Sequence, residues 1–379
     1  MQSPTPGAPQ GAPTDTRVHA LDHLRALAML MGVVFHAALA YSPLVQPIWP
    51  GADRQNWWGV DAAIWLPHLI RMPLFFLVAG FFTAWLLAQR GGAGLARQRV
   101  RRILLPFLLA WPLVHVATSF STQWAMQYVD HPAPLLVLFR QLMAMPDPPS
   151  LPLSTGHLWF LYYLLLFSLL LWVARSLDWD RFIGKWLDAG PAVVSLSLPL
   201  LLWPGFMLTG APHPAPEGLL PQFWAMLIYG PFFALGLGLH GRLHWLAPLQ
   251  RCFWPGVLLC LGLYALFLLR LAEGATLTST PWWWAAIEAL IAGWGSLLAL
   301  LAGLRWMQHA NALMRYLAAS SYWTYLWHLP ILLTLQYLLM DHNWAWPLKF
   351  ALCLSATLAI CLLSYEWLVR RTALRRYVG

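Results

Sequence analysis

The sequence predicts an all-α protein: a polytopic membrane helix bundle of about ten transmembrane helices with both termini cytoplasmic. Of its 379 residues, 60% are hydrophobic and only 10% are charged, whereas soluble proteins carry about 25% charged residues. Long apolar segments follow one another along the chain, and Lys and Arg gather in alternate gaps between them. Together these observations favour a single membrane bundle over soluble domains.

The predicted spans are apolar segments near the length of roughly 20 residues that a membrane-crossing helix needs. In chain order they are 22–43, 62–88, 103–120, 157–175, 190–208, 221–240, 252–272, 282–302, 319–340 and 347–369. The long connection 121–156 is rich in Pro and Met, and we expect a short interfacial helix within it.

The orientation follows from the positive residues. With the N-terminus inside, the gap after the second span and the C-terminal end are cytoplasmic and hold Arg90, Arg97, Arg99, Arg101, Arg102, Arg370, Arg371, Arg375 and Arg376. The outer gaps are poor in Lys and Arg. Both termini on one side require an even number of spans.

The two ends of the chain differ from the bundle. Residues 1–16 are rich in Pro, Gly and Thr, which predicts a disordered tail without the apolar core of a signal peptide. Residues 17–371 form the predicted transmembrane domain, and 372–379 a basic cytoplasmic tail. The net charge of +9 lies in short gaps between spans, so we predict no nucleic-acid partner. The four cysteines lack metal-ligand spacing, and we predict no metal.

Ionisable side chains inside spans are costly, and they usually mark a function. His36 lies about 16 Å beyond Arg25 along the first helix, at 1.5 Å per residue. By the same rise, Arg71 in the second span reaches the level of His36. An inner group contains Arg25, Arg99, Arg102 and Glu366, and an outer or central group contains His36, Arg71, His157, Glu288 and His328. This layout suits chemistry between a cytoplasmic donor and an outward-facing acceptor.

Simpler explanations exist for several of these residues. Arg25 can extend to lipid headgroups, and His157 and His328 can bridge helices as packing residues. Arg71 is harder to explain in this way, because a buried arginine needs partners.

Several motifs in order resemble the acyltransferase-3 family of membrane acyltransferases over about 17–371. Arg25 and His36 match its R-x10-H signature within LDHLRALAMLMGVVFH. FFLVAGFF at 75–82 resembles its FF-x-x-SG-F-x segment, with Ala79 where Ser is usual, and RVRR at 99–102 resembles its R-x-x-R motif. HLWFLYYL at 157–164 and YLWHLPI at 325–331 have counterparts. HLIRMPLFFLVAG resembles the branch that modifies osmoregulated periplasmic glucans.

The resemblance implies an O-acyltransferase of the bacterial inner membrane. It would move a succinyl or acetyl group from cytoplasmic succinyl-CoA or acetyl-CoA to a hydroxyl of a periplasmic or cell-surface glycan. His36 would act as general base or carry the acyl group briefly. Arg25 would hold donor charge or stabilise the oxyanion, with Glu366 to orient it. Arg99 and Arg102 would bind the phosphates of CoA.

The remaining expected site residues bind substrate. His157 and Trp159 would line the acceptor side, and His328 would contribute near the middle of the membrane. Arg71 would pair with the distal carboxylate of a succinyl donor. Expected partners are the glycan acceptor, membrane lipids and glucan synthesis machinery.

Two other functions remain open from the sequence. A transporter or flippase for a lipid-linked glycan would explain buried charges without chemistry, although no inverted repeat is visible. A scaffold for a glycan synthase would not need a buried His and Arg. The acyl group, the acceptor, the oligomeric state and the choice between an acyl-histidine and direct transfer are also open.

Overall fold

The computed structural model describes residues 14–149, 153–273 and 280–378. Within these ranges the chain is helical, and its β-structure is confined to an isolated bridge between Ser154 and Gly218. The predicted all-α class is therefore confirmed. Residues 1–13 of the predicted disordered tail lie outside the described residues, whereas 14–16 already belong to the first helix.

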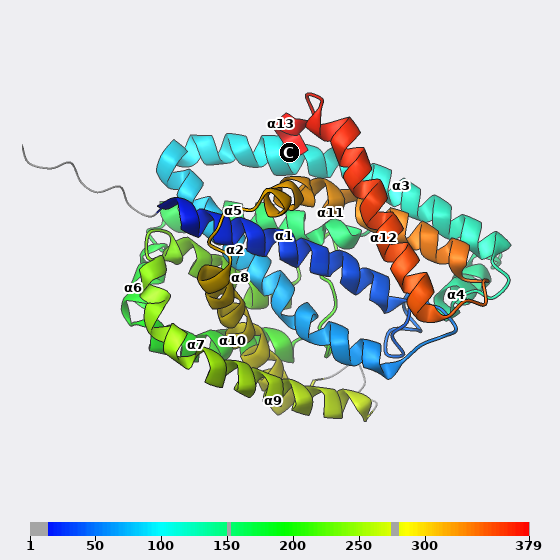
Figure 1. The fold of residues 1–379 in the computed structure, drawn as a ribbon, viewed down its shortest axis with the longest axis horizontal. Helices are drawn as coiled ribbons and strands as arrows, with labels where there is room; N and C mark the ends of the chain where they lie inside the picture. Colours follow the sequence, from blue (N-terminus) through cyan, green and yellow to red (C-terminus); the bar gives the residue numbers. More distant parts are fainter. Residues whose placement is uncertain (1–13, 150–152, 274–279, 379) are drawn as a thin grey trace, which may run out of the picture.

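The elements run in a single series along the chain (Figure 1). They are α1 (Thr14–Leu39), α2 (Trp58–Arg99), a π-helical turn (Val100–Leu104), α3 (Leu105–Tyr128), α4 (Pro134–Met143), a 3₁₀ turn (Gly156–Leu158), α5 (Trp159–Ser176), α6 (Arg181–Asp188), α7 (Pro191–Met207), α8 (Phe223–Leu239), a 3₁₀ segment (Leu243–Cys252), α9 (Phe253–Ala272), α10 (Trp282–Trp306), α11 (Ala312–Leu339), α12 (Trp346–Ser364), a second π-helical turn (Tyr365–Arg370) and α13 (Arg375–Val378).

Each predicted span falls on a separate helix of this series. By length and composition, six helical segments of the described chain are long and apolar enough to cross a membrane. They are His19–Leu39, Trp58–Tyr128, Gly156–Ser176, Leu243–Ala272, Trp282–Trp306 and Trp346–Arg370. Trp58–Tyr128 contains two predicted spans, because α2, the π-helical turn and α3 are continuous. The fold is that of a multi-pass membrane protein.

The arginine-rich gap after the second predicted span is itself helical. Helix α2 continues to Arg99 and bends at Gly91, whose φ is 63°. Glycine reaches this left-handed conformation without a Cβ clash, so the helix turns here and does not end. The expected short helix in 121–156 is α4. The predicted C-terminal tail also folds in part, since Val378 of α13 is buried in the main apolar core.

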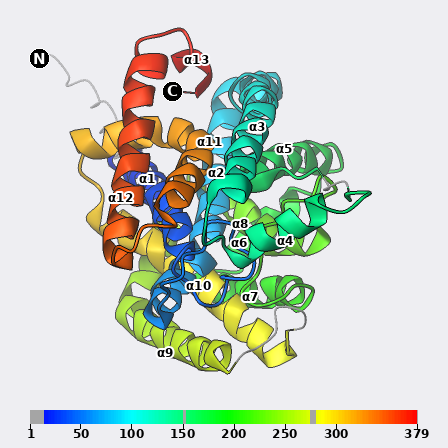
Figure 2. The ribbon, with the colours of Figure 1, turned by 90° about the vertical axis from the view of Figure 1, so that its right-hand side faces the viewer.

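Helix α2 packs closely on α8 at the centre of the bundle. A Cβ on Gly80 would collide with the backbone carbonyl of Phe233, and one on Gly236 would collide with that of Leu77. Small residues therefore let the two backbones touch, as in other membrane bundles. Helix α1 packs between α2 and α11, while α9 and α13 lie at opposite edges (Figures 1 and 2).

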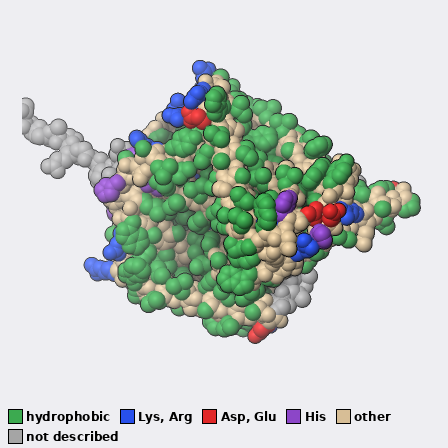
Figure 3. Space-filling view, turned by 45° about the vertical axis from the view of Figure 1, so that its right-hand side comes forward, with side chains coloured by type: hydrophobic (Ala, Val, Ile, Leu, Met, Phe, Trp, Pro, Cys, Tyr) green, Lys and Arg blue, Asp and Glu red, His purple; other side chains and the backbone are tan. Residues whose placement is uncertain are grey.

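Many large apolar side chains are exposed on the outer surface. Hydrophobic side chains cover much of the face in Figure 3, and charged residues form small groups, some at its edge and one on its right-hand part. On α3, Leu109, Leu113, Val116 and Phe120 are 68%, 57%, 66% and 74% exposed. Side chains of this kind suit contact with lipid tails.

Candidate active site

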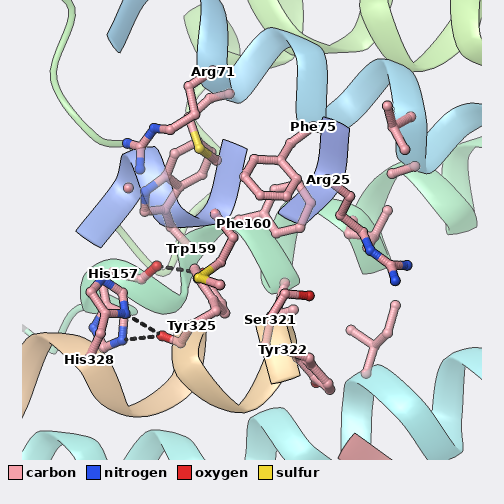
Figure 4. A pocket seen from close by; sticks show the side chains of 18 of the residues that line it. Arg25, Arg71, Phe75, His157, Trp159, Phe160, Ser321, Tyr322, Tyr325 and His328 are labelled. Carbon is pink, nitrogen blue, oxygen red and sulfur yellow. Dashed lines mark hydrogen bonds between the residues drawn. The ribbon is translucent and has the colours of Figure 1, made fainter. Parts of the chain in front are cut away.

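A cavity of about 370 Å³ lies inside the bundle and is lined by residues of α1, α2, α5 and α11. Helix α1 presents Arg25, Met29, Gly32 and His36 to it. The step of eleven residues from Arg25 to His36 corresponds to about three helical turns, so both side chains face the same side. The R-x10-H spacing therefore places a cation and an imidazole along one cavity. Figure 4 shows Arg25 at one end and His157 with His328 at the other.

The hydrogen-bond partners assign the tautomer of His36. His328 Nδ1 lies 3.0 Å from the carbonyl of Thr324 and 2.9 Å from that of Tyr325. A carbonyl only accepts, so His328 Nδ1 carries the proton and His328 Nε2 has a lone pair. His36 Nδ1 lies 2.9 Å from His328 Nε2 and must donate to it. His36 Nε2 is thus the basic nitrogen, which is the arrangement a general base requires.

His157 is held against a kink in α11. Pro330 has no N–H, so it leaves the carbonyl of Leu326 without its helical donor. His157 Nε2 donates to this carbonyl at 3.2 Å and to that of Tyr325 at 3.1 Å, and Tyr325 Oη donates back to the carbonyl of His157 (Figure 4). The expected bridging of helices by this histidine is therefore present, and the ring still lines the cavity.

Arg71 is a buried cation without a carboxylate partner in the described part of the chain. Its guanidinium lies 5.2 Å from the ring centre of Phe35, and Arg71 is only 8% exposed. Its Nε atom has no hydrogen-bond acceptor among the described residues. A Cβ on Gly32 would collide with Arg71 Nη1, so this glycine makes room for the guanidinium one turn before His36. Arg71 lines the same cavity as His36.

Three arginines line the opposite end of the cavity. Arg25 pairs with Asp22 at 3.3 Å and donates to the carbonyl of Ala318 at 3.5 Å. Arg99 donates to the hydroxyl of Thr83. The π-helical turn contains Arg102 and lets it share the cavity with Arg99. Together with Arg71, these side chains make the cavity strongly positive, which favours an anionic ligand.

Glu366 is the one predicted site residue outside this lining. Its carboxylate pairs with Arg370 at 2.9 Å and with Arg371 at 3.3 Å. Asp22 is the carboxylate that contacts Arg25. The reason is local geometry: residues 22 and 25 are one turn apart on α1, whereas Glu366 lies beside the arginines of its own segment. The other predicted residues, His36, Arg25, Arg99, Arg102, Arg71, His157, Trp159 and His328, all line the cavity.

The structure adds two residues that the sequence did not single out. Tyr325 provides the carbonyl that orients both His157 and His328. Glu217 is the only carboxylate in the lining, and burial raises the pKa of its side chain. One sequence feature could have identified Glu217: it is the single acidic residue between α7 and α8. In the described ranges, no group of three or more His, Cys, Asp or Glu residues is arranged to hold a metal ion.

Comparisons with known proteins identify the family of this chain. A family model described as an acyltransferase domain matches residues 18–366. Proteins named glucans biosynthesis protein C from Salmonella typhi and from Escherichia coli O1:K1 are each 24% identical to this chain, over 92% of it and 91% of their own length. No solved structure matches the chain significantly. The family match covers most of the chain and includes the R-x10-H helix and its cavity: the protein belongs to the acyltransferase-3 family and is a membrane O-acyltransferase.

Proposed function

We propose that the protein transfers an acyl group from cytoplasmic acyl-CoA to a hydroxyl of a glycan on the outer side of the bacterial inner membrane. The observation that carries the proposal is the cavity itself. It joins three arginines at one end to a histidine at the other whose Nε2 is free to act as a base. In the proposed membrane topology, all ten predicted spans cross the membrane and both termini are cytoplasmic. The placement of each span on a separate helix supports that topology.

The donor would enter at the arginine end. CoA carries phosphates, which guanidinium groups bind by charge-assisted hydrogen bonds. Arg99 and Arg102 are suited to this role, because both line the cavity beside the predicted cytoplasmic end of α3. Arg25 lines the same cavity, where it can hold donor charge. The thioester would then lie deeper, toward His36.

The chemical step begins from the assigned tautomer. His36 Nε2 takes the proton of the acceptor hydroxyl while the oxygen attacks the thioester carbonyl. The C–S bond breaks, and the departing thiolate takes the proton from His36, so the products are an ester and free CoA. His36 Nδ1 keeps its hydrogen bond to His328 throughout. The same Nε2 lone pair would also serve an acyl-histidine route.

Arg71 is proposed to recognise the acyl group. It is the cation that faces the cavity at the level of His36 and has no carboxylate partner within the described ranges. A succinyl group carries a distal carboxylate, which would neutralise this buried charge. An acetyl group leaves the guanidinium unpaired. The proposal therefore favours succinyl-CoA as donor.

The acceptor assignment rests on the relatives. Their name, glucans biosynthesis protein C, supports a glucan as the acceptor. Periplasmic glucan and the machinery that makes it are then the proposed partners.

The direct test uses purified full-length protein in lipid nanodiscs with radiolabelled succinyl-CoA and a gluco-oligosaccharide. We expect His36→Ala to lower the rate of transfer about 10²–10⁴-fold, the usual contribution of a positioned base. His309→Ala is the matched control, because His309 is exposed and lines neither described cavity. Glycan transport that persists in His36→Ala, without any acyl transfer by the wild type, would instead support a flippase.

A further inference from the structure

A second cavity, of about 730 Å³, lies between α3, α4 and the connection into α5. Its volume is in the range of roughly 300–1,000 Å³ that is typical of small-molecule sites. His157, Glu217 and Leu329 line both cavities. The two cavities therefore adjoin, separated only by the side chains of a few residues.

Helix α3 turns a polar face toward the second cavity. The lining includes His115, Thr118, Ser119, Thr122 and Gln127. At 100° per residue, His115, Thr118, Ser119 and Thr122 lie within an arc of about 100° on one side of α3. The exposed apolar side chains of the same helix, such as Val116, lie on another side. A polar face on a membrane helix is unfavourable against lipid, and it suits an occupant that forms hydrogen bonds.

The charge of the second cavity differs from that of the first. Arg140 is the only Lys or Arg among its described lining residues. The Arg140 guanidinium is bound to backbone carbonyls at the end of α3, including that of Val129 at 2.7 Å and that of Met126. It therefore caps helix α3 and is not directed to an anion. The first cavity contains four arginines, so an anionic donor favours the first cavity and a neutral molecule suits the second.

The position of the second cavity fits an acceptor route. It extends along α3 from Trp111 to Gln127, about 24 Å of helix that leads away from Arg102. At its inner side lies His157, whose ring centre is 5.1 Å from that of His328. The ring of His328 is in turn 5.2 Å from that of His36. A hydroxyl that passes His157 would thus arrive beside the proposed base.

Glu217 lies at the junction of the two cavities. Thr155 donates to the Glu217 carbonyl from its backbone N–H at 2.7 Å and from its hydroxyl at 3.0 Å. These bonds fix the backbone of the residue. Its carboxylate forms no hydrogen bond within the described ranges and lines both cavities. A half-buried carboxylate in this position can accept a hydrogen bond from a sugar hydroxyl.

We infer that the second cavity is the acceptor groove, that it takes a neutral, hydroxyl-rich segment of a glycan, and that Glu217 binds the acceptor next to the hydroxyl that reacts. The polar face of α3 supplies hydrogen bonds, and Trp111 and Phe139 supply apolar surface for the sugar rings. Trp111 is held in place by its Nε1–H bond to the carbonyl of Ser154, at 2.9 Å. This inference rests on the proposed function, because it presupposes a glycan acceptor.

The test compares Ser119→Trp with Val116→Trp in full-length protein. Both add an indole to the same helix, but Ser119 lines the groove, whereas Val116 is 66% exposed on the apolar side. We expect Ser119→Trp to raise the KM for a neutral gluco-oligosaccharide at least about tenfold, as expected when a pocket contact is obstructed. Its KM for acyl-CoA and its rate of acyl-CoA hydrolysis should match those of Val116→Trp. An unchanged KM for the gluco-oligosaccharide would contradict the assignment of this cavity as the acceptor groove. An equally large effect on the KM for acyl-CoA and on its hydrolysis would contradict it as well.

Equilibrium dialysis with the same tritiated gluco-oligosaccharide separates this inference from the proposed function, since it needs no chemistry. Binding that is weakened in Ser119→Trp and retained in Val116→Trp supports the groove even if transfer fails. Tighter binding of a sulfated oligosaccharide would contradict the assignment to a neutral glycan. Loss of a co-purified phospholipid from Ser119→Trp, with glycan binding intact, would identify a lipid site instead.

A second variant tests the junction. Glu217→Gln keeps the size of the side chain but weakens its acceptor strength. We expect kcat/KM for the gluco-oligosaccharide and its binding in equilibrium dialysis both to fall at least about tenfold. Equal kinetics in Glu217→Gln and the wild type would contradict a role for Glu217 in binding the acceptor.

Discussion

His36 donates its Nδ1–H to the Nε2 atom of His328, 2.9 Å away. His328 can accept this bond because its own Nδ1–H is directed to the carbonyls of Thr324 and Tyr325. The backbone of α11 therefore determines which nitrogen of a histidine on α1 is basic. An outer hydrogen-bond partner commonly sets the tautomer of a functional histidine in this way.

The first prediction concerns that partner. His328→Leu removes the acceptor and leaves His36 free to adopt either tautomer and to rotate. We expect kcat to fall about 10²-fold or more, given the loss of about 10⁴-fold when a catalytic histidine takes the wrong tautomer. The KM for acyl-CoA should change little. His328→Asn retains an oxygen acceptor and should recover part of the activity; equal kcat in His328→Leu and the wild type would contradict the role.

A second prediction concerns selection of the acyl group. Arg71→Leu removes the buried cation, so a succinyl carboxylate would lose its partner whereas an acetyl group would not. We expect kcat/KM for succinyl-CoA to fall about 10²-fold relative to that for acetyl-CoA, as expected when a buried charged group loses its partner. Competition between the two donors measures this ratio. Arg54→Leu, at an exposed position, is the control, and equal losses for both donors would argue against donor selection.

Gly32→Ala gives a third prediction without touching Arg71. The added Cβ would occupy the space of Arg71 Nη1 and displace the guanidinium. We expect the same shift in succinyl-to-acetyl selectivity as in Arg71→Leu, although smaller. The matched control is Gly262→Ala in α9, where a Cβ meets no neighbour within 4 Å. Alanine favours helix over glycine by up to about 1 kcal/mol, so a lost selectivity with an unchanged or higher Tm would exclude general unfolding.

The fourth prediction distinguishes two neighbouring arginines. Arg99 lines the cavity, whereas Arg97 is exposed and lies outside the described lining. We expect Arg99→Ala to raise the KM for acyl-CoA roughly 10- to 150-fold, which corresponds to the approximately 1.5–3 kcal/mol of a hydrogen bond to a charged group. Arg97→Ala should leave that KM unchanged. Similar effects of both substitutions on donor KM would show that general positive charge, not a cavity contact, attracts the donor.

The last prediction concerns Glu366. Its carboxylate pairs with Arg370 and Arg371 and does not line the cavity. We therefore expect Glu366→Gln to retain kcat within about twofold, since exposed ion pairs contribute little. Asp22→Asn, which removes the carboxylate next to Arg25, should have the larger effect on kcat/KM for acyl-CoA. A larger loss in Glu366→Gln than in Asp22→Asn would instead support Glu366 as the partner of Arg25.

The sequence by itself determined the helical class, the positions of the helices and the pairing of Arg25 with His36 along one face. These are local properties: apolar runs specify helices in a membrane, and eleven residues span about three turns wherever the helix is placed. The same local rule is the basis of the predicted depth of Arg71, which lines the same cavity as His36. It also explains why the continuous helix at Arg97–Arg102 was missed, since charges mark a membrane boundary but do not end a helix.

Only the tertiary structure decided which groups meet across helices. The atom that accepts the hydrogen bond from His36 Nδ1–H belongs to His328 of α11, nearly three hundred positions away in the chain. Asp22 rather than Glu366 contacts Arg25, and Glu217 enters the site from a loop. Such contacts depend on helix rotation and on close approaches between backbones, as at Gly80 and Gly236. Packing of side chains from distant segments sets these quantities, and no spacing within one segment encodes them.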